Sequence, residues 1–144
     1  MKKQGIGFKI ERINTLQFAT INSVPLNADK IEETIDFTFN SIKEDHIVNC
    51  LFGYTLYESK SPFIKIQVAC SFQIVPKDFE QLLNSDVFRI PLGFARHLAN
   101  ITVGTTRGIL HNKTEGTSYN AFPVGIIDIE TILDEDIIID FIEK

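Results

Sequence analysis

Two strand-like segments, His46 to Tyr57 and Phe63 to Val75, flank the short turn-forming stretch Glu58 to Pro62. A hairpin centred on Lys60 places only apolar residues opposite one another on one face of the pair. These facing pairs are Val48–Phe72, Cys50–Cys70, Phe52–Val68, Tyr54–Ile66 and Leu56–Ile64. A shift of one residue would turn every one of these side chains to the other face. The pattern therefore predicts an antiparallel hairpin with one buried face.

The opposite face of the same hairpin is mostly polar. It carries the pairs Thr55–Lys65, Gly53–Gln67 and Asn49–Ser71, with Leu51–Ala69 and Tyr57–Phe63 as apolar exceptions. The register also makes Cys50 and Cys70 cross-strand neighbours. A disulfide between directly opposed strand residues is strained, so we expect two buried thiols.

Two further strands are expected before the hairpin. The pattern from Phe8 to Ile21 predicts a strand whose phase slips near Arg12–Asn14, which indicates a bulge or bend. Residues 23–29 are expected to form a connection. Ile35 to Phe39 alternates cleanly and predicts a strand with one buried face, followed by a polar turn from Lys43 to His46.

The best helix candidate is Phe88 to Gly108, with Pro91 in its first turn. Its apolar and small residues recur every three or four positions, at Leu92, Ala95, Leu98, Ala99 and Thr102. Such a stripe must pack on a sheet or on a second copy of the helix. We expect both: the leucines meet the sheet, and the oligomer interface is formed by Ala95, Ala99 and Thr102.

Shorter elements complete the expected order. Pro76 to Leu83 predicts a helical turn, residues 111–118 a polar loop, and Ala121 to Ile127 an extended, packed segment. Asp128 is expected to cap a helix that runs to about Asp134. The β-branched tail from residue 137 to 142 fits a strand or a continuation of that helix.

The chain has 144 residues and a formal net charge of −5, which argues against a nucleic-acid-binding face. We expect residues 1–144 to form a single domain. The acids near the C-terminus, among them Asp134, Glu135 and Glu143, form either a solvated helix face or a docking surface for a basic partner. The sequence MKKQGIGF lacks the apolar stretch of a secretory signal, so a cytoplasmic location is expected.

Residues typical of catalytic or metal sites are not arranged for that chemistry. His46, His97 and His111 share no spacing typical of metal ligands. The stretch Gly104 to Gly108 is rich in glycine and threonine, but it lies at the end of a helix and not at its start, so it lacks the N-terminal dipole that binds phosphate. We therefore expect the protein to have no enzymatic activity and to bind no metal ion and no cofactor.

Three phrases in the sequence resemble the SecB family of bacterial export chaperones and their SecB-like relatives. Phe8-Lys-Ile-Glu-Arg-Ile13 resembles the opening strand of the family. The run from Phe88 to Arg96 resembles the phrase that leads into its long helix, and Ala121-Phe-Pro-Val-Gly-Ile126 resembles the stretch before its last helix. Together with the order of the elements, the resemblance covers roughly residues 8–134.

The resemblance implies an α+β fold: a four-stranded antiparallel sheet followed by a long helix and a C-terminal helix, assembled as a dimer or tetramer. It implies ATP-independent binding of unfolded or pre-export polypeptides in apolar grooves, with a translocase ATPase or an antitoxin as a further partner. By position, the client-binding residues would be Phe72, Ile74, Phe122, Val124 and Ile126. These five residues fit equally well as part of the monomer core.

Two other classes of function stay open from the sequence. An adaptor or scaffold of the same fold would bind one dedicated folded partner, including a toxin–antitoxin component, through the acidic C-terminal segment. A ligand-binding or catalytic role would require an enclosed pocket with convergent polar groups.

Overall fold

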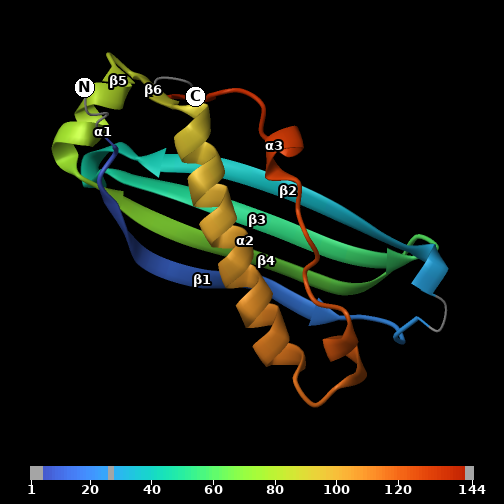
Figure 1. Ribbon diagram of the computed structural model, residues 1–144. Coiled ribbons are helices and arrows are strands. Elements are labelled where there is room, and N and C mark those ends of the chain that lie inside the picture. The colour runs from blue at the N-terminus through green and yellow to red at the C-terminus, as the bar shows by residue number, and fades with distance from the viewer. Residues whose placement is uncertain (1–4, 26–27, 142–144) are drawn as a thin grey trace.

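The structure is a computed structural model that describes residues 5–25 and 28–141 (Figure 1). Strands β1 to β4 form one sheet, and a long helix with the chain that follows it lies on one face of that sheet. The bounds of the elements are β1 Phe8–Thr20, β2 Ile31–Ile42, β3 Ile47–Glu58, β4 Ser61–Ile74, α1 Pro76–Leu82, β5 Leu83–Asn84, β6 Val87–Ile90, α2 Leu92–Thr114, α3 Ile129–Ile132 and β7 Ile137–Asp140. Short 3-10 turns occupy Ala28–Lys30, Lys43–Asp45 and Ser118–Ala121.

The predicted register of the β3–β4 hairpin is confirmed from Val48–Phe72 through Leu56–Ile64. Near the turn it differs, because Tyr57 lies opposite Pro62 instead of Phe63. The two-residue turn Ser59–Lys60, with φ of 49° and 75°, closes between Glu58 and Ser61. The predicted hairpin is centred on Lys60, whereas a two-residue turn is centred between Ser59 and Lys60, so the pairing next to the turn is shifted by one residue. A bulge with Phe63 as the extra residue restores the predicted pairing from Leu56–Ile64 onward.

The strand order is β1-β4-β3-β2, so β1 and β2 are the edges of an antiparallel sheet. Strand β1 has register irregularities between Ile10 and Arg12 and between Thr15 and Gln17. The first lies beside the predicted slip, and the second was not predicted. The bulge at Glu11 keeps Ile10 and Ile13 on the same face of the sheet, because they lie opposite Phe72 and Cys70.

The long helix starts later and ends later than the sequence predicted. Val87–Ile90 is strand β6, and α2 begins at Leu92 with Pro91 at its N-cap. Proline disfavours helical backbone in the residue before it, which explains why the helix cannot include residue 90. At the other end, α2 continues to Thr114 through part of the predicted polar loop. Thr114 is buried there, and its hydroxyl donates to the carbonyl oxygen of Leu110.

The C-terminal region departs most from expectation. Helix α3 ends at Ile132, with Asp128 at its N-cap position. The Asp128 carboxylate accepts from the Thr131 hydroxyl at 2.6 Å and from no backbone N–H of the first turn, so the predicted backbone cap does not form. The tail forms strand β7, which pairs with β6 in a small second sheet of order β5-β6-β7. The acidic segment is therefore not one continuous helix face. Glu143 and residue 142 lie outside the described residues.

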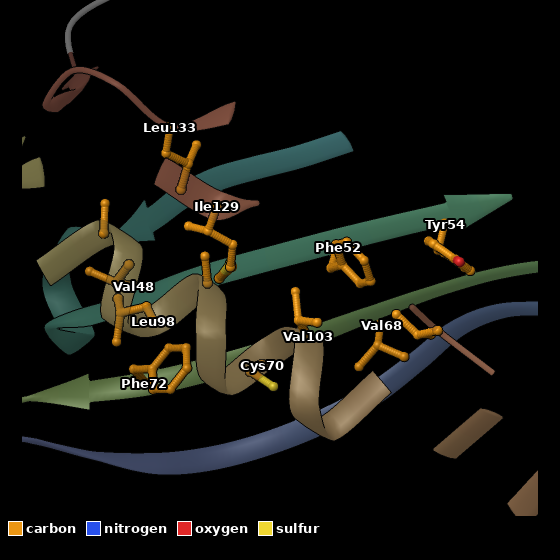
Figure 2. Close-up of a cluster of buried hydrophobic side chains, with 14 of the residues drawn as sticks. Val48, Phe52, Tyr54, Val68, Cys70, Phe72, Leu98, Val103, Ile129 and Leu133 are labelled. Carbon is orange, nitrogen blue, oxygen red and sulfur yellow. The ribbon is translucent and has the colours of Figure 1, made fainter. Parts of the chain in front are cut away.

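The core lies between α2 and the central strands β3 and β4. Leu98 and Val103 of α2 lie over Val48, Val68 and Phe72, and Ile129 and Leu133 reach the same cluster from the α3 region (Figure 2). Cys50 and Cys70 are both buried as free thiols, as predicted. Among the described residues, no helix is long and apolar enough to cross a membrane.

Candidate binding site

The chain from Phe122 to Leu133, called the strap below, runs back along the α2 side of the sheet (Figure 1). Two arginines of α2 hold it by its backbone. Arg107 donates from Nε to the carbonyl oxygen of Val124 at 2.9 Å and from Nη2 to that of Gly125 at 2.5 Å. Arg96 donates likewise to the carbonyl oxygens of Leu133 and Glu130, at 2.9 and 3.0 Å. The strap is thus fixed to α2 at two separate points.

Tyr54 of β3 supports the strap from the sheet. Its hydroxyl donates to Oε1 of Glu33 at 2.9 Å and accepts from the backbone N–H of Gly125 at 3.3 Å. Burial raises the pKa of Tyr54 to about 12, and the neighbouring Glu33 adds to the rise. The phenol therefore stays protonated at neutral pH and keeps its bond to Glu33.

The five predicted client-binding residues occupy three different environments. Phe72 and Ile74 are fully buried in the core, and Val124 of the strap is buried as well. Phe122 is half-buried and packs edge-on against Phe63 at 5.1 Å between ring centroids. Ile126 is 95% exposed. In this conformation an extended client can reach Ile126 and part of Phe122 only, and client binding by the five residues stays a prediction.

The three predicted interface residues, Ala95, Ala99 and Thr102, are fully buried within the single chain. The hydroxyl of Thr102 donates to the carbonyl oxygen of Leu98 at 2.8 Å. Their small size is explained by the close approach of α2 to β3 and β4. An oligomer interface through these residues stays a prediction, and in this conformation their side chains offer it no surface.

Two apolar flanks were not singled out from the sequence. On β1, Ile10, Ile13 and Leu16 are 45%, 47% and 51% exposed. On β2, three core-facing side chains stay half-buried: Ile35, Phe37 and Phe39. The alternation of β2 was visible in the sequence, and so was an apolar pattern with a phase slip in β1. The exposure of these side chains could not be predicted from the sequence. It arises because α2 covers β3 and β4 and leaves the edge strands β1 and β2 on either side of it.

The histidine, cysteine and acidic side chains bear on whether the protein can hold a metal ion. Among the residues that the structure describes, no group of three His, Cys, Asp or Glu side chains could hold a metal ion. The three histidines have local partners: His46 lies 3.4 Å from Glu80, His111 lies 3.6 Å from Glu115, and His97 packs edge-on against Phe8.

The four-stranded antiparallel sheet, with the long helix and the strap on one face, is a SecB-like fold. Comparison with solved structures identifies a similar chain in Mycobacterium tuberculosis Rv1957, a SecB-like chaperone in complex with a ChAD peptide from the Rv1956 HigA1 antitoxin. The TM-score is 0.53 at 10% sequence identity, over 83% of this chain and 90% of that one. This likeness shows the fold.

A protein of unknown function from Streptococcus agalactiae is also similar, with a TM-score of 0.43 and 11% identity over 87% of this chain and 99% of that one. No protein-family model and no curated protein matches the sequence.

Proposed function

We propose that this chain is a non-enzymatic, ATP-independent chaperone that binds unfolded polypeptide segments on the α2 side of its sheet. One observation carries the proposal. The helix and strap cover the central strands, and apolar side chains stay accessible beside them, on β2 and on the strap. Accessible apolar surface that is spread along strands suits extended segments of many sequences.

The β2 side offers a client two kinds of contact. Strand β2 is an edge of the sheet, so it can pair with an extended backbone, while Phe37 and Phe39 supply apolar surface beside it. Ile126 of the strap adds an exposed aliphatic side chain. Because Phe72, Ile74 and Val124 are buried, a client reaches them only if the strap or α2 moves.

The antitoxin peptide bound by the similar mycobacterial chaperone supports an antitoxin as one client class. A pre-export polypeptide handed to a translocase ATPase is the other class that we propose. Co-purification of the chain with a neighbouring antitoxin, or with the translocase ATPase, distinguishes the two.

The decisive experiment measures aggregation of several unfolded clients with near-stoichiometric amounts of the chain and no ATP. We expect delayed aggregation, and a weaker delay for Ile126→Asn. That residue is almost fully exposed, so its replacement leaves the fold intact. The matched control is Ile138→Asn, at an exposed isoleucine of the small second sheet. If the parent protein delays aggregation of no client, the proposed function is wrong.

We propose a homo-oligomer in which β1 pairs with β1 of a second copy. A free edge of this length that also exposes Ile10, Ile13 and Leu16 would otherwise promote uncontrolled association. Light scattering after gel filtration should give a dimer or a multiple of it, and Ile13→Lys should reduce its size. A parent protein that stays monomeric at micromolar concentration refutes this assembly.

The adaptor alternative rests on the acidic residues Glu130, Asp134 and Glu135, which are all exposed. An adaptor would retain one folded partner in a pull-down, would release it at high salt, and would delay aggregation of no general client.

A further inference from the structure

The face of the sheet that points away from α2 contains a hollow of about 360 Å³. We call it the outer trough. Six polar side chains from all four strands line it: Gln17, Thr34, Asp36, Thr55, Lys65 and Gln67. The strand pairing explains how they meet, since Gln17, Gln67, Gly53 and Asp36 form one row across the sheet, and Lys65, Thr55 and Thr34 form the next. The trough is thus built by the register of the large sheet.

Gly53 at the centre of β3 makes room for the charge in the trough. A Cβ atom at this position would lie 2.6 Å from Oδ2 of Asp36, so the carboxylate extends over the glycine instead of away from the sheet. The missing side chain at residue 53 leaves the hollow, and the Asp36 carboxylate lies at its edge. Glycine in the middle of a strand weakens the strand, so a close approach of this kind is a reason for its presence.

The six polar side chains of the trough have no side-chain partners in the part of the chain that the structure describes. Across residues 5–25 and 28–141, none of the six side chains makes a side-chain hydrogen bond or an ion pair. A row further along the same face, beyond Leu51 and Ala69, differs, because Ser71 donates to Asn49 at 2.6 Å and Asn49 donates to Asn40 at 2.7 Å. The trough therefore presents unpaired donors and acceptors at a place where the sheet could have paired them.

The two charges of the trough are opposite and lie in adjacent rows. Asp36 faces Gly53 on β3, and Lys65 faces Thr55, two residues further along the same strand. Lys65 lies on β4 and Asp36 on β2, so their Cα atoms are two strand spacings apart across the sheet and two residues apart along the strands. Together these offsets correspond to a separation of about 12 Å. The Asp36 side chain extends over Gly53 of β3, and the side chain of Lys65 is long enough to bend toward it. The carboxylate and the ammonium group can therefore lie closer to each other than the two Cα atoms do, at a separation that a small molecule can span.

From this arrangement we propose that the outer trough binds a small zwitterion, a free α-amino acid with a polar side chain. Its ammonium group pairs with Asp36 and its carboxylate with Lys65, which are the complementary charges. The amides of Gln17 and Gln67 and the hydroxyls of Thr34 and Thr55 accept and donate hydrogen bonds to the side chain of the ligand. A hollow of about 360 Å³ is large enough for such a ligand.

The test is an amide-resolved NMR titration of the full chain with L-glutamine as the probe. Because the trough is open to water, we expect saturable binding in the millimolar range, with shifted signals confined to residues that line the trough. Two blocked analogues separate the charges: N-acetyl-L-glutamine lacks the ammonium group and L-glutaminamide lacks the carboxylate. Each should bind at least about tenfold more weakly, the loss of one charge-assisted contact.

Variants connect the probe to the residues. Asp36→Asn should abolish the preference for L-glutamine over its N-acetyl form, and Lys65→Gln should abolish the preference over the amide. Gly53→Ala should weaken binding without removing any polar group, because its Cβ displaces the Asp36 carboxylate. The matched control Lys9→Gln removes a lysine of β1 outside the trough and should leave binding unchanged.

Three results would overturn the proposal: no saturable shifts at the trough, shifts centred elsewhere, or equal binding of L-glutamine and both blocked analogues. None of these outcomes depends on chaperone activity, because the trough and the proposed client surface lie on opposite faces of the sheet.

Discussion

Removing one of the two arginine contacts should loosen one end of the strap and leave the other end in place. In Arg107→Met the methionine keeps an apolar stem beside α2 but loses both bonds to the carbonyl oxygens of Val124 and Gly125. Each bond from a partly exposed guanidinium contributes about 1 kcal/mol net, so the pair contributes about 2 kcal/mol. Loss of about 2 kcal/mol makes local opening of the strap roughly thirtyfold more frequent.

Native-state hydrogen exchange measures that opening residue by residue. The amide of Gly125, which donates to the Tyr54 hydroxyl, should exchange faster in Arg107→Met, while the amides of the α2 core keep their protection. Arg96→Met is the matched variant. It should speed exchange near Leu133, whose carbonyl oxygen it releases, and leave Gly125 nearly unchanged.

The expected result is a local effect at opposite ends of the strap in the two variants. If Arg107→Met changes exchange across the whole chain equally, the arginine stabilises the global fold and not the strap. If exchange at Gly125 does not change, the two hydrogen bonds contribute nothing measurable. Under the proposed function, the looser strap should also change client affinity, because Val124 becomes accessible.

Three further predictions concern stability and the thiols. Hydrogen bonds from the Leu92 N–H and from Arg89 lower the pKa of Asp136 below its ordinary value. The ionised carboxylate should therefore stabilise the fold fully at pH values above the ordinary pKa, and this stabilisation should disappear as the pH falls through the lowered pKa. The Asp136→Asn variant should lack this pH-dependent part of the stability in an acid unfolding experiment. Burial raises the pKa of Cys50 to about 12, so its thiol in the native protein should react very slowly with a thiol reagent. Because Cys50 and Cys70 are free cysteines, the unfolded protein should show two reactive thiols, and fewer than two would contradict the absence of a disulfide between them. Ala99→Leu should lower the free energy of unfolding by about 1–3 kcal/mol, because Ala99 is fully buried against the sheet; unchanged thermal stability would contradict this packing.

The small residues of α2 show what reasoning from the sequence leaves open. A stripe of small residues on a helix fits a partner helix and a close sheet equally well, and both were expected. The structure buries Leu98 in the core, as expected, and buries Ala95 and Ala99 within the same chain as well. The period of a helix fixes which residues share a face, but not what that face meets.

The elements that were misplaced lie where local preference and tertiary pairing compete. The predicted helix includes Phe88 to Ile90, but these residues belong to strand β6, because β7 supplies a partner 47 or more residues later in the chain, as in the pair Ile90–Ile137. The tail beyond Asp134 stayed open between helix and strand for the same reason. Its isoleucines favour strands, but a strand of this length needs a partner, which the sequence does not name.

The sequence by itself determined the central hairpin of the large sheet and its register away from the turn. Alternation in Val48 to Leu56 and in Ile64 to Phe72 allows one pairing that places the alternating apolar side chains on one buried face, with Leu51 and Ala69 as exceptions. The opposed cysteines followed from this pattern with a period of two. Only the tertiary structure decided which of these surfaces remain accessible. Exposure on β1 and β2, the two arginine contacts to the strap and the unpaired groups of the outer trough depend on where α2 crosses the sheet and on how four strands align. Those are relations between residues far apart in the chain, and no local pattern encodes them.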